Sequence, residues 1–480
     1  MSLMLRVRQI ADKSFRFLLL GYLCVCVETS IGQSEETDSN GSYCRIVVVE
    51  EGSGWPVPLI ELRTTNQLRF ITDNAGVIAL NDPSLMNREI WFSVLGHGYG
   101  VPADGFGFRG IRLTPKSGQN LRVEVKRSSL AKRIGRLTGE GLFAESQKLG
   151  EQKAWKDGPV FGSDSVQNAV YRNQMFWAWG DTQIATYPLG LFDMSGATTP
   201  VRPFASYEPP LYPRLDYFVD GNKKPRPIAK MPGTGPTWLT GVVSLLDKTG
   251  MEHLVAFYRK ITPPLKPYEA GLCVWSDASQ SFEHLLTVWK ESTGEPKPAL
   301  LVDGHPTFWT DPQGERWLLF GNPLPRVRLP ATFEAWQDMS QWQNLQPQKT
   351  LESAVDGALI EPHSGSMAWN GYRQRWVSVF MQNFGKPSAF GTLWYAESDL
   401  PTGPWGPAVE ILSHDNYTFY NPRLHPEFTL PDEPVLLFEG TYTAEFADRP
   451  EPTPRYNYNQ ILYRIDLNED ALRPARLFAP

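Results

Sequence analysis

The feature of this sequence that most restricts its fold is an aromatic-rich segment that recurs at a nearly constant interval. The copies lie 79, 62, 60 and 59 residues apart and read MFWAWG, LVAFYR, RWLLFG, WVSVFM and LLFEG, ending at Gly180, Arg259, Gly321, Met381 and Gly440. Such a period, with several short strands per unit, is typical of a β-propeller, because one four-stranded blade cannot bury both faces without neighbours. Five units predict an all-β chain with a five-bladed β-propeller over residues 155–475.

A small β-sandwich is predicted ahead of the propeller, over residues 43–126. Apolar and polar residues alternate there with a period of two, and Gly, Asn and Asp separate the runs. The segment VPLIELRTTNQLRFITDNAGVIAL resembles the transthyretin-like, carboxypeptidase-regulatory-like fold, and the resemblance implies an accessory module. His97, in the turn LGHGYG, is either a ligand contact at the boundary with the next domain or a simple turn histidine.

Residues 127–154 are the predicted linker between the two domains. From Lys126 to Lys153 the chain has seven basic residues and three acidic ones, and SSLAKRIGRL is expected to form a short amphipathic helix. A basic segment in an acidic protein is expected to dock the two domains against each other rather than to bind nucleic acid.

The first 32 residues are predicted to be a signal peptide. Four basic residues precede an apolar run from Phe17 to Val27, which has the length of a signal-peptide core and is too short to cross a membrane. Cleavage near Gly32 gives a secreted or periplasmic protein with no stable membrane insertion. An uncleaved anchor and a lipoprotein attached at Cys24 stay open as alternatives.

The composition narrows the classes of partner. There are 46 Lys and Arg against 52 Asp and Glu, a formal charge of −6, which argues against a nucleic-acid groove and suits a carbohydrate partner. Cys44 and Cys273 remain after signal cleavage, and we expect two unpaired or buried thiols. No Cys/His cluster, P-loop or dinucleotide motif indicates a metal site or a cofactor, although a structural ion in the propeller channel stays open.

Three acidic residues lie at equivalent places in the repeat. The first strand of a blade runs along the central channel, so the residues that open the repeats are expected to converge at one end of it. Three of these openings, FGSDSVQNAVYRNQ, LVDGHPTFWTDPQGE and LIEPHSGSMAWNGY, contain Asp164, Asp303 and Glu361. Each acid alone has a structural explanation, as a turn cap, an Asx-turn or an ion-pair partner.

The motifs DGHPTFWTDPQGERWLLFG and EPHSGSMAWNGYRQRWVSVF place an acid just before an aromatic hairpin. This pattern resembles the five-bladed propeller glycoside hydrolases of the arabinanase and β-xylosidase type. The resemblance implies a general base at Asp164, an orienting and pKa-tuning residue at Asp303, a general acid at Glu361, and an inverting mechanism. The chain departs from the family where Ser165 and Gly304 replace the usual proline, and where Pro362 directly follows Glu361.

Other residues are predicted to bind substrate, or are alternatives to Asp164, Asp303 and Glu361 as catalytic acids. His305 and His363 could act as an acid catalyst, a substrate contact, an ion ligand or a simple hydrogen-bonded histidine. Tryptophans near the channel could stack on sugar rings or fill the core between blades. The predicted substrate-binding residues are His305, His363, Trp179, Trp238 and Arg423, and the reserve acids are Asp181, Glu439 and Glu269.

These observations favour a secreted glycoside hydrolase that cleaves a polysaccharide or oligosaccharide with paired carboxylates. Two alternatives belong to other classes: a non-catalytic propeller that binds glycan or protein, and a polysaccharide lyase. A lyase would need a Tyr or His base beside a group that neutralises charge.

Overall fold

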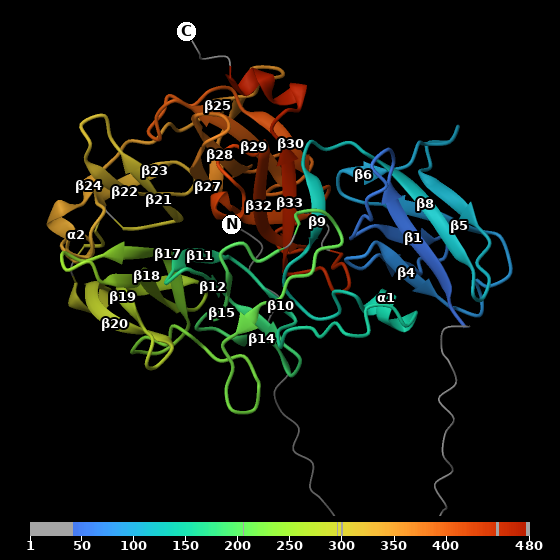
Figure 1. The fold of residues 1–480 in the computed structure, drawn as a ribbon, viewed down its shortest axis with the longest axis horizontal. Coiled ribbons are helices and arrows are strands. Elements are labelled where there is room, and N and C mark those ends of the chain that lie inside the picture. Colours follow the sequence, from blue (N-terminus) through green and yellow to red (C-terminus); the bar gives the residue numbers. More distant parts are fainter. Residues whose placement is uncertain (1–41, 205, 295, 299–300, 448–450, 477–480) are drawn as a thin grey trace, which may run out of the picture. The chain divides into compact units, whose positions relative to one another are not determined.

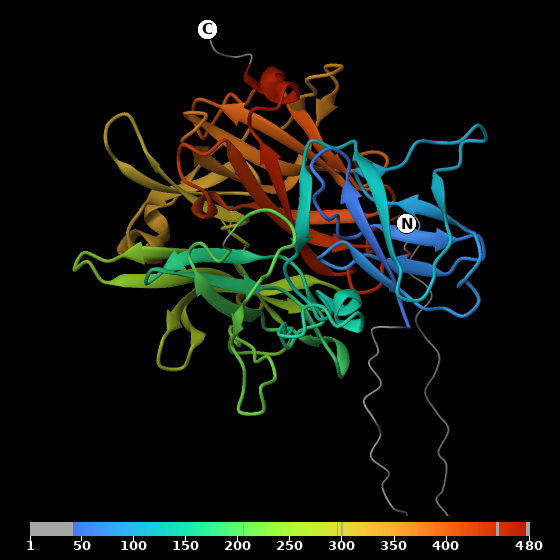
Figure 2. The same cartoon turned by 45° about the vertical axis from the view of Figure 1, so that its right-hand side comes forward.

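Five four-stranded antiparallel sheets follow one another along the chain and form the blades of a propeller (Figures 1 and 2). The computed structural model describes residues 42–204, 206–294, 296–298, 301–447 and 451–476, all of which belong to one unit, Ser39–Pro480. The predicted signal peptide lies outside the described residues. The all-β fold class with a five-bladed propeller is confirmed.

The first three blades each use four strands that are close in sequence. Blade one contains β11 (Gln167–Tyr171), β12 (Gln174–Trp179), β15 (Ser195–Pro200) and β16 (Asp216–Tyr217). Blade two contains β17 (Thr237–Leu246), β18 (Glu252–Thr262), β19 (Lys266–Ser276) and β20 (Ser281–Lys290). Blade three contains β21 (His305–Thr310), β22 (Arg316–Gly321), β23 (Pro325–Pro330) and β24 (Gln343–Asn344).

The last two blades differ in how they are completed. Blade four contains β27 (Pro362–Asn370), β28 (Arg375–Gln382), β29 (Thr392–Ser398) and β30 (Val409–Ser413). Blade five contains β31 (Thr418–Leu424), β32 (Val435–Thr443) and β33 (Asn459–Asp466), and its fourth strand comes from the linker, β9 (Lys132–Arg136). The predicted strand in the C-terminal segment TPRYNYNQILYRIDL is confirmed as β33.

The ring is held together by apolar clusters between neighbouring blades. Each of five clusters joins one blade to the next, and the fifth joins blade five back to blade one through Trp177, Leu437 and Leu462. The first strands contact each other in order around the axis: β11 with β17, β17 with β21, β21 with β27, and β27 with β31. Every blade thus buries both faces, as the sequence period requires.

The prediction of a helix over SSLAKRIGRL is wrong. The segment KRIGR forms β9, which pairs antiparallel with β33, as the label β9 beside β33 shows in Figure 1. Ile134 fills the core between blades one and five, and the side chains of Arg133 and Arg136 are buried. The edge of a three-stranded blade offers unpaired backbone groups, and pairing with them outweighs the local helix propensity.

The N-terminal domain is a β-sandwich, as predicted. One sheet has the order β4-β1-β8-β6 and contains β1 (Cys44–Glu50), β4 (Val77–Leu80), β6 (Tyr99–Gly100) and β8 (Asn120–Arg127). The other has the order β3-β2-β5-β7 and contains β2 (Glu61–Thr64), β3 (Arg69–Ile71), β5 (Ile90–Leu95) and β7 (Gly110–Leu113). Its assignment to the transthyretin-like fold stays an expectation.

The remaining elements are short. In the part of the chain that the structure describes, the two α-helices are α1 (Ala144–Lys148) and α2 (Phe333–Gln337). One minor sheet has the order β10 (Gly162–Ser163), β13 (Thr182–Ile184), β14 (Tyr187–Leu191), and another pairs β25 (Leu351–Glu352) with β26 (Leu359–Ile360). None of the helices in the described residues is long and apolar enough to span a membrane. Within the same residues, Cys44 and Cys273 are buried and form no disulfide, as expected.

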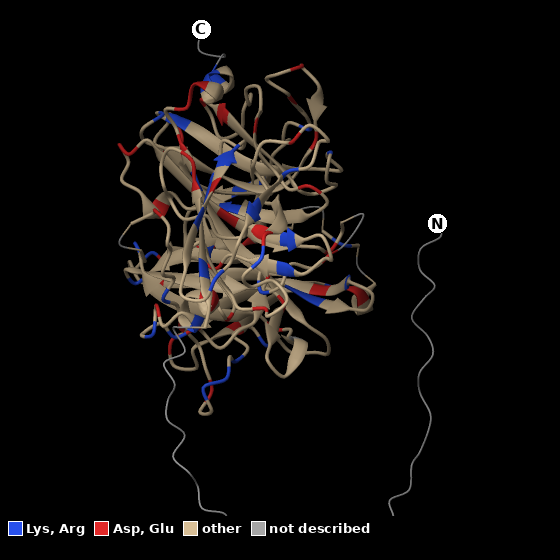
Figure 3. Cartoon of the chain, turned by 90° about the vertical axis from the view of Figure 1, so that its right-hand side faces the viewer, with Lys and Arg blue, Asp and Glu red and all other residues tan. Residues whose placement is uncertain are grey.

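Charged residues of both signs are interspersed along the ribbon in the view of Figure 3. No band of one sign follows the strands in that view. This distribution agrees with the near balance of 46 Lys and Arg against 52 Asp and Glu in the sequence.

Candidate functional site

A cavity of about 640 Å³ lies where the first strands of the blades begin. Each of the five blades contributes to it, and the lining includes residues at or next to the start of each first strand: Asp164 and Gln167, Trp238 to Thr240, Asp303 to His305, His363, and Thr418, Tyr420 and Asn421. The predicted convergence of the repeat openings therefore holds for these residues. Among the predicted site residues, Asp164, Asp303, His305, His363 and Trp238 line the cavity, whereas Glu361, Trp179 and Arg423 do not.

Asp164 lies in a cluster of polar groups at the cavity wall. The hydroxyl of Tyr420 donates to its Oδ2 at 2.6 Å, and the nearby hydroxyl of Tyr458 also lowers the pKa of this carboxyl. Gly180 makes this approach possible, since a Cβ there would lie 2.1 Å from Oδ1 of Asp164. Burial raises the pKa of Asp164 to about 7, even though the two tyrosines lower it, so desolvation outweighs the hydrogen bonds.

Two further carboxyls belong to this cluster. Burial raises the pKa of Asp181 to about 6, while Trp238 Nε1 donates to its Oδ1 at 3.1 Å. Burial also raises the pKa of Glu445, and the negative charges of Asp181 and Glu445 contribute to the raised pKa of Asp164. Asp181 was a reserve in the sequence. Glu445 was missed because it lies in the β32–β33 connection, where the repeat gives no register.

Asp303 occupies a more open place. Its side chain is 45% exposed, and Arg259 Nη1 lies 3.4 Å from its Oδ1. Arg259 is itself fixed by an Nη2 donation to the carbonyl of Val302 at 3.0 Å. Gly304 has a φ of +75°, and a Cβ there would lie 2.0 Å from the carbonyl oxygen of Gly321, so the turn after Asp303 requires glycine.

On blade four the structure brings His363, not Glu361, to the cavity. Glu361 is exposed just before β27, and its carbonyl accepts from the backbone N–H of Asn383 at 2.9 Å. The ring of His363 lines the cavity with Phe390, 5.2 Å away between ring centroids. The pairing of β27 with β28 shifts in register between Pro362 and Gly365, which sequence spacing could not reveal.

The remaining predicted residues are Trp179 in the core, His305 in the cavity wall and Glu269 on β19. Trp179 is fully buried and stacks on Trp177 at 5.8 Å between centroids, so it fills the core between blades. His305 lines the cavity, and its pKa lies well below the usual range because it is buried, with the nearby charge of Arg423 as a second cause. Glu269, a reserve acid, is buried on β19, where it accepts from Tyr258 at 2.9 Å and pairs with Lys290 at 2.8 Å.

Arg423 takes part in a buried polar network below the cavity. Its Nε donates to Asn168 Oδ1 at 3.0 Å, and the Nδ2 of Asn168 lies 3.1 Å from Nδ1 of His425. Nε2 of His425 lies 2.9 Å from Oε1 of Glu439, whose pKa burial raises to about 8. These bonds link the first strands of blades one and five. Within the described residues, no group of three or more His, Cys, Asp or Glu side chains is arranged to hold a metal ion.

Comparison with known proteins gives distant structural similarity only. No family model matches the chain, and no curated protein matches it. Among solved structures, an exo-1,5-alpha-L-arabinanase from a bovine ruminal metagenomic library is 11% identical, with 64% of this chain and 94% of that chain covered and a TM-score of 0.35. An endo-1,5-alpha-L-arabinanase from Thermotoga petrophila is 11% identical, with coverages of 66% and 74% and a TM-score of 0.38. An exo-beta-1,3-galactanase from Phanerochaete chrysosporium is 9% identical, with coverages of 69% and 64% and a TM-score of 0.37.

Proposed function

We propose that this chain is a glycoside hydrolase whose reaction takes place in the cavity at the start of the first strands. The observation that carries the proposal is the pairing of two different carboxyls in one cavity. Asp164 is partly buried, with its pKa raised to about 7 by desolvation, and Asp303 is half exposed beside Arg259. Cleavage of a glycosidic bond needs carboxyls whose environments differ, because one group moves a proton while another holds charge.

In this proposal Asp164 is the general base. A base works best when its pKa lies near the working pH, which the raised pKa of Asp164 provides. Ionised Asp164 takes a proton from a water molecule, the water attacks the anomeric carbon, and the configuration is inverted. Tyr420 and Tyr458 hold the carboxyl in place, and Asp303 with Arg259 orients the sugar.

The acid that protonates the leaving oxygen comes from blade four. The sequence resemblance assigns this role to Glu361. The position of His363 in the cavity lining favours His363, with Glu361 as the alternative. Both residues can donate a proton, so the two assignments differ in position and not in reaction type.

The walls of the cavity suit a sugar. Trp238, Phe390 and Phe446 offer apolar ring surface, while Gln167 and Asn421 supply amide groups for hydroxyls. Aromatic faces with a few placed polar groups are typical of sites for small polar ligands. Together with the predicted signal peptide, this supports an exported enzyme that acts on a polysaccharide or oligosaccharide.

The proposal is tested by hydrolysis of a panel of arabinan, galactan and xylan oligosaccharides, with product configuration followed by proton NMR. The wild-type chain is expected to release reducing sugar with inversion, and Asp164→Asn is expected to lose that activity. Asp220→Asn is the matched control. Asp220 Oδ1 accepts hydrogen bonds from two backbone N–H groups in an exposed turn, and the side-chain oxygen of Asn can accept the same bonds. Equal hydrolysis by wild type and Asp164→Asn would refute the assignment of the base.

A lyase is the second candidate, and one observation favours it. Tyr420, His363 and Arg259 line the same cavity, which gives a potential base and a charge-neutralising group. A lyase makes an unsaturated product that absorbs ultraviolet light. If uronate-containing glycans gave ultraviolet-absorbing products without uptake of water, the reaction would be elimination and not hydrolysis. Binding of glycan with no turnover would leave the non-catalytic propeller.

A further inference from the structure

One connection of the last blade contacts both the cavity and the N-terminal domain. The chain between β32 and β33, residues 444–458, places Glu445, Phe446 and Tyr458 in the cavity lining. Residues between Glu451 and Tyr456 in the same connection contact the β-sandwich and β9. The contacts of this connection therefore join a domain that lies outside the propeller ring to the group that reacts in the proposed mechanism.

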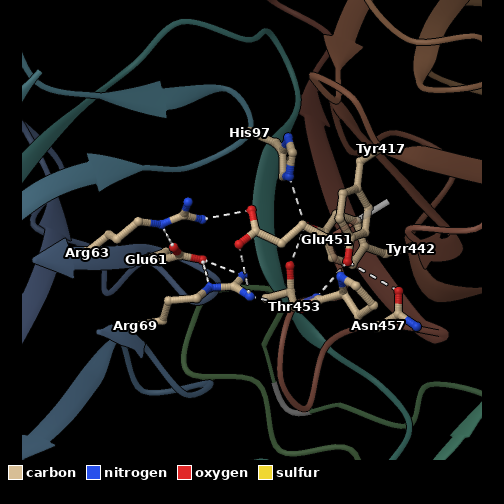
Figure 4. A network of polar contacts seen from close by, with 10 residues as sticks. Glu61, Arg63, Arg69, His97, Tyr417, Tyr442, Glu451, Thr453 and Asn457 are labelled. Atoms are coloured by element: carbon tan, nitrogen blue, oxygen red, sulfur yellow. Dashed lines mark hydrogen bonds and ion pairs between the residues drawn. The ribbon is translucent and has the colours of Figure 1, made fainter. Parts of the chain in front are cut away.

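The first set of contacts is a charged one. The carboxylate of Glu451 lies 3.1 Å from Arg63 Nη2 and 3.6 Å from Arg69 Nη1, and Arg69 Nη1 also donates to the carbonyl of Pro452 at 3.1 Å (Figure 4). The carboxylate of Glu61 forms ion pairs with both guanidinium groups, at 2.5 Å from Arg63 Nε and 2.7 Å from Arg69 Nη2. Since Arg63 and Arg69 are fixed by their own domain, they offer Glu451 a pre-arranged pair of donors.

The second set of contacts is buried. The hydroxyl of Tyr456 donates to the carbonyl of Thr72 at 2.8 Å and accepts from the backbone N–H of Leu59 at 3.2 Å. The guanidinium of Arg136, on β9, lies 5.1 Å from the centroid of the Tyr456 ring, and Arg136 also donates to the carbonyl of Arg455. Tyr456 is only 3% exposed, so this contact is isolated from water.

The part of the connection that contacts the β-sandwich is hydrogen-bonded directly to the part that lines the cavity. Asn457 Oδ1 accepts from the backbone N–H of Ala444 at 2.7 Å and from the hydroxyl of Tyr417 at 3.2 Å. The backbone N–H of Tyr458 donates to the carbonyl of Tyr442 at 2.7 Å. The hydroxyl of Tyr442 lies 2.8 Å from Nε2 of His97 in the β-sandwich (Figure 4).

We propose that the β-sandwich is a positioning part of the active site. Arg63, Arg69 and the backbone around Thr72 hold the β32–β33 connection so that Tyr458 and Glu445 reach Asp164. The expected effect on catalysis rests on the proposed hydrolase function, whereas the positioning of the connection by the β-sandwich does not. Arg63 and Arg69 of the sandwich, and Tyr456 within the connection, are positioning residues, because they make these contacts without lining the cavity. We call the contacts of Arg63, Arg69 and Thr72 with the connection the clamp. A small displacement of a group that orients a base lowers the reaction rate, so removal of the clamp lowers turnover.

The variants are chosen to loosen the clamp without touching the cavity. Glu451→Gln removes a charge from a side chain that is 56% exposed, and Tyr456→Phe removes a hydroxyl and keeps the ring. In Tyr456→Phe the N–H of Leu59 keeps the carbonyl of Thr72 as a partner at 3.3 Å. The controls are Glu89→Gln, whose ion pair with Arg112 is exposed, and Tyr372→Phe, whose hydroxyl donates to Asn468.

Two measurements on the full chain separate this inference from the proposed function. Hydrogen–deuterium exchange is expected to show faster uptake in peptides covering 444–447 and 451–460 in both clamp variants and not in the controls. On a substrate that the wild type hydrolyses, the chain that combines Glu451→Gln with Tyr456→Phe is expected to lose about tenfold in kcat/KM, mainly in kcat. The low-pH limb of its activity is expected to shift, because the connection brings both the Tyr458 hydroxyl and the Glu445 charge to Asp164 and so contributes to its pKa.

Four groups face Asp164 and enter this pH effect: Tyr420 on β31, Tyr458 and Glu445 on the connection, and Asp181 after β12. Unchanged exchange in both clamp variants would overturn the inference whatever the activity. Faster exchange with unchanged kcat and pH limb would also overturn it. If the wild type hydrolyses nothing, the proposed function fails, while the exchange data still decide whether the sandwich holds the connection.

Discussion

The two sides of the cavity contain acids from equivalent places in the repeat, yet they differ in environment. On the side of blades one and five, Asp164 is strongly desolvated, accepts from Tyr420, and shares its surroundings with Tyr458, Asp181 and Glu445. On the side of blades three and four, Asp303 is 45% exposed and Glu361 is exposed outside the cavity. A shared repeat position thus fixes where a residue enters the channel, while neighbouring loops decide its solvation and its proton affinity.

The largest effect is expected from exchanging acid for amide on the buried side. Asp164→Asn should lower kcat by about 10³-fold, since a general base contributes that much. Asp303→Asn should act more on KM, because Asp303 is proposed to orient the sugar. Steady-state kinetics on the same oligosaccharide check both. A larger loss of kcat in Asp303→Asn than in Asp164→Asn would reverse the assignment of the two sides.

The next effect concerns blade four. His363→Gln should lower kcat by about 10²-fold, as loss of a general acid does, whereas Glu361→Gln should change it little. A substrate with a good leaving group, such as an aryl glycoside, needs less help from the acid and should restore much of the activity of His363→Gln. The opposite pattern, with Glu361→Gln inactive and rescued in this way, would return the acid to the position that the sequence resemblance implies.

The two sides should also differ in stability. The pKa of Asp164 in the folded state is raised to about 7, above its value of 3.8 in the unfolded chain. Its contribution to stability is therefore present below the unfolded pKa and is lost as the pH rises through about 7. Asp164→Asn, which cannot ionise, should exceed the wild type by about 1–2 kcal/mol at alkaline pH and lose this advantage in acid. Urea unfolding at several pH values measures the difference.

Asp303→Asn provides the contrast for that experiment. Because Asp303 is half exposed and pairs with Arg259 at 3.4 Å, its replacement should change the free energy of unfolding by less than about 1 kcal/mol. An Asp164→Asn variant that is no more stable than the wild type at alkaline pH would indicate that Asp164 is better hydrated than the structure implies.

The smallest effect is a shift in pH dependence. If Asp164 is the base, activity falls as the pH drops through about 7, because the protonated carboxyl cannot accept a proton. Tyr420→Phe removes a donor that lowers this pKa, so the same limb should move to higher pH. A profile of kcat/KM against pH shows the limb. Activity that instead falls as the pH rises through about 7 would make Asp164 the acid.

Much of the fold followed from the repeat, and part of the site did too. The interval near sixty residues predicted five blades, and the first strands meet at the cavity with Asp164, Asp303, His305, His363 and Trp238. The sequence did not reveal the choice between Glu361 and His363, because a local register shift decides it. Nor did it reveal Glu445 or Tyr458, because the β32–β33 connection lies outside the repeated part of the blade.

The sequence by itself determined that the chain forms blades, since aromatic strands at a fixed interval can bury both faces only by stacking in a ring. Only the tertiary structure decided that β9 completes blade five, that Trp179 belongs to the core, and that Asp164 is desolvated. The physical reason is the separation along the chain of the residues that interact. Strand formation and blade stacking depend on local pattern, whereas edge pairing, burial and proton affinity depend on segments far apart in the chain, such as Arg69 and Glu451.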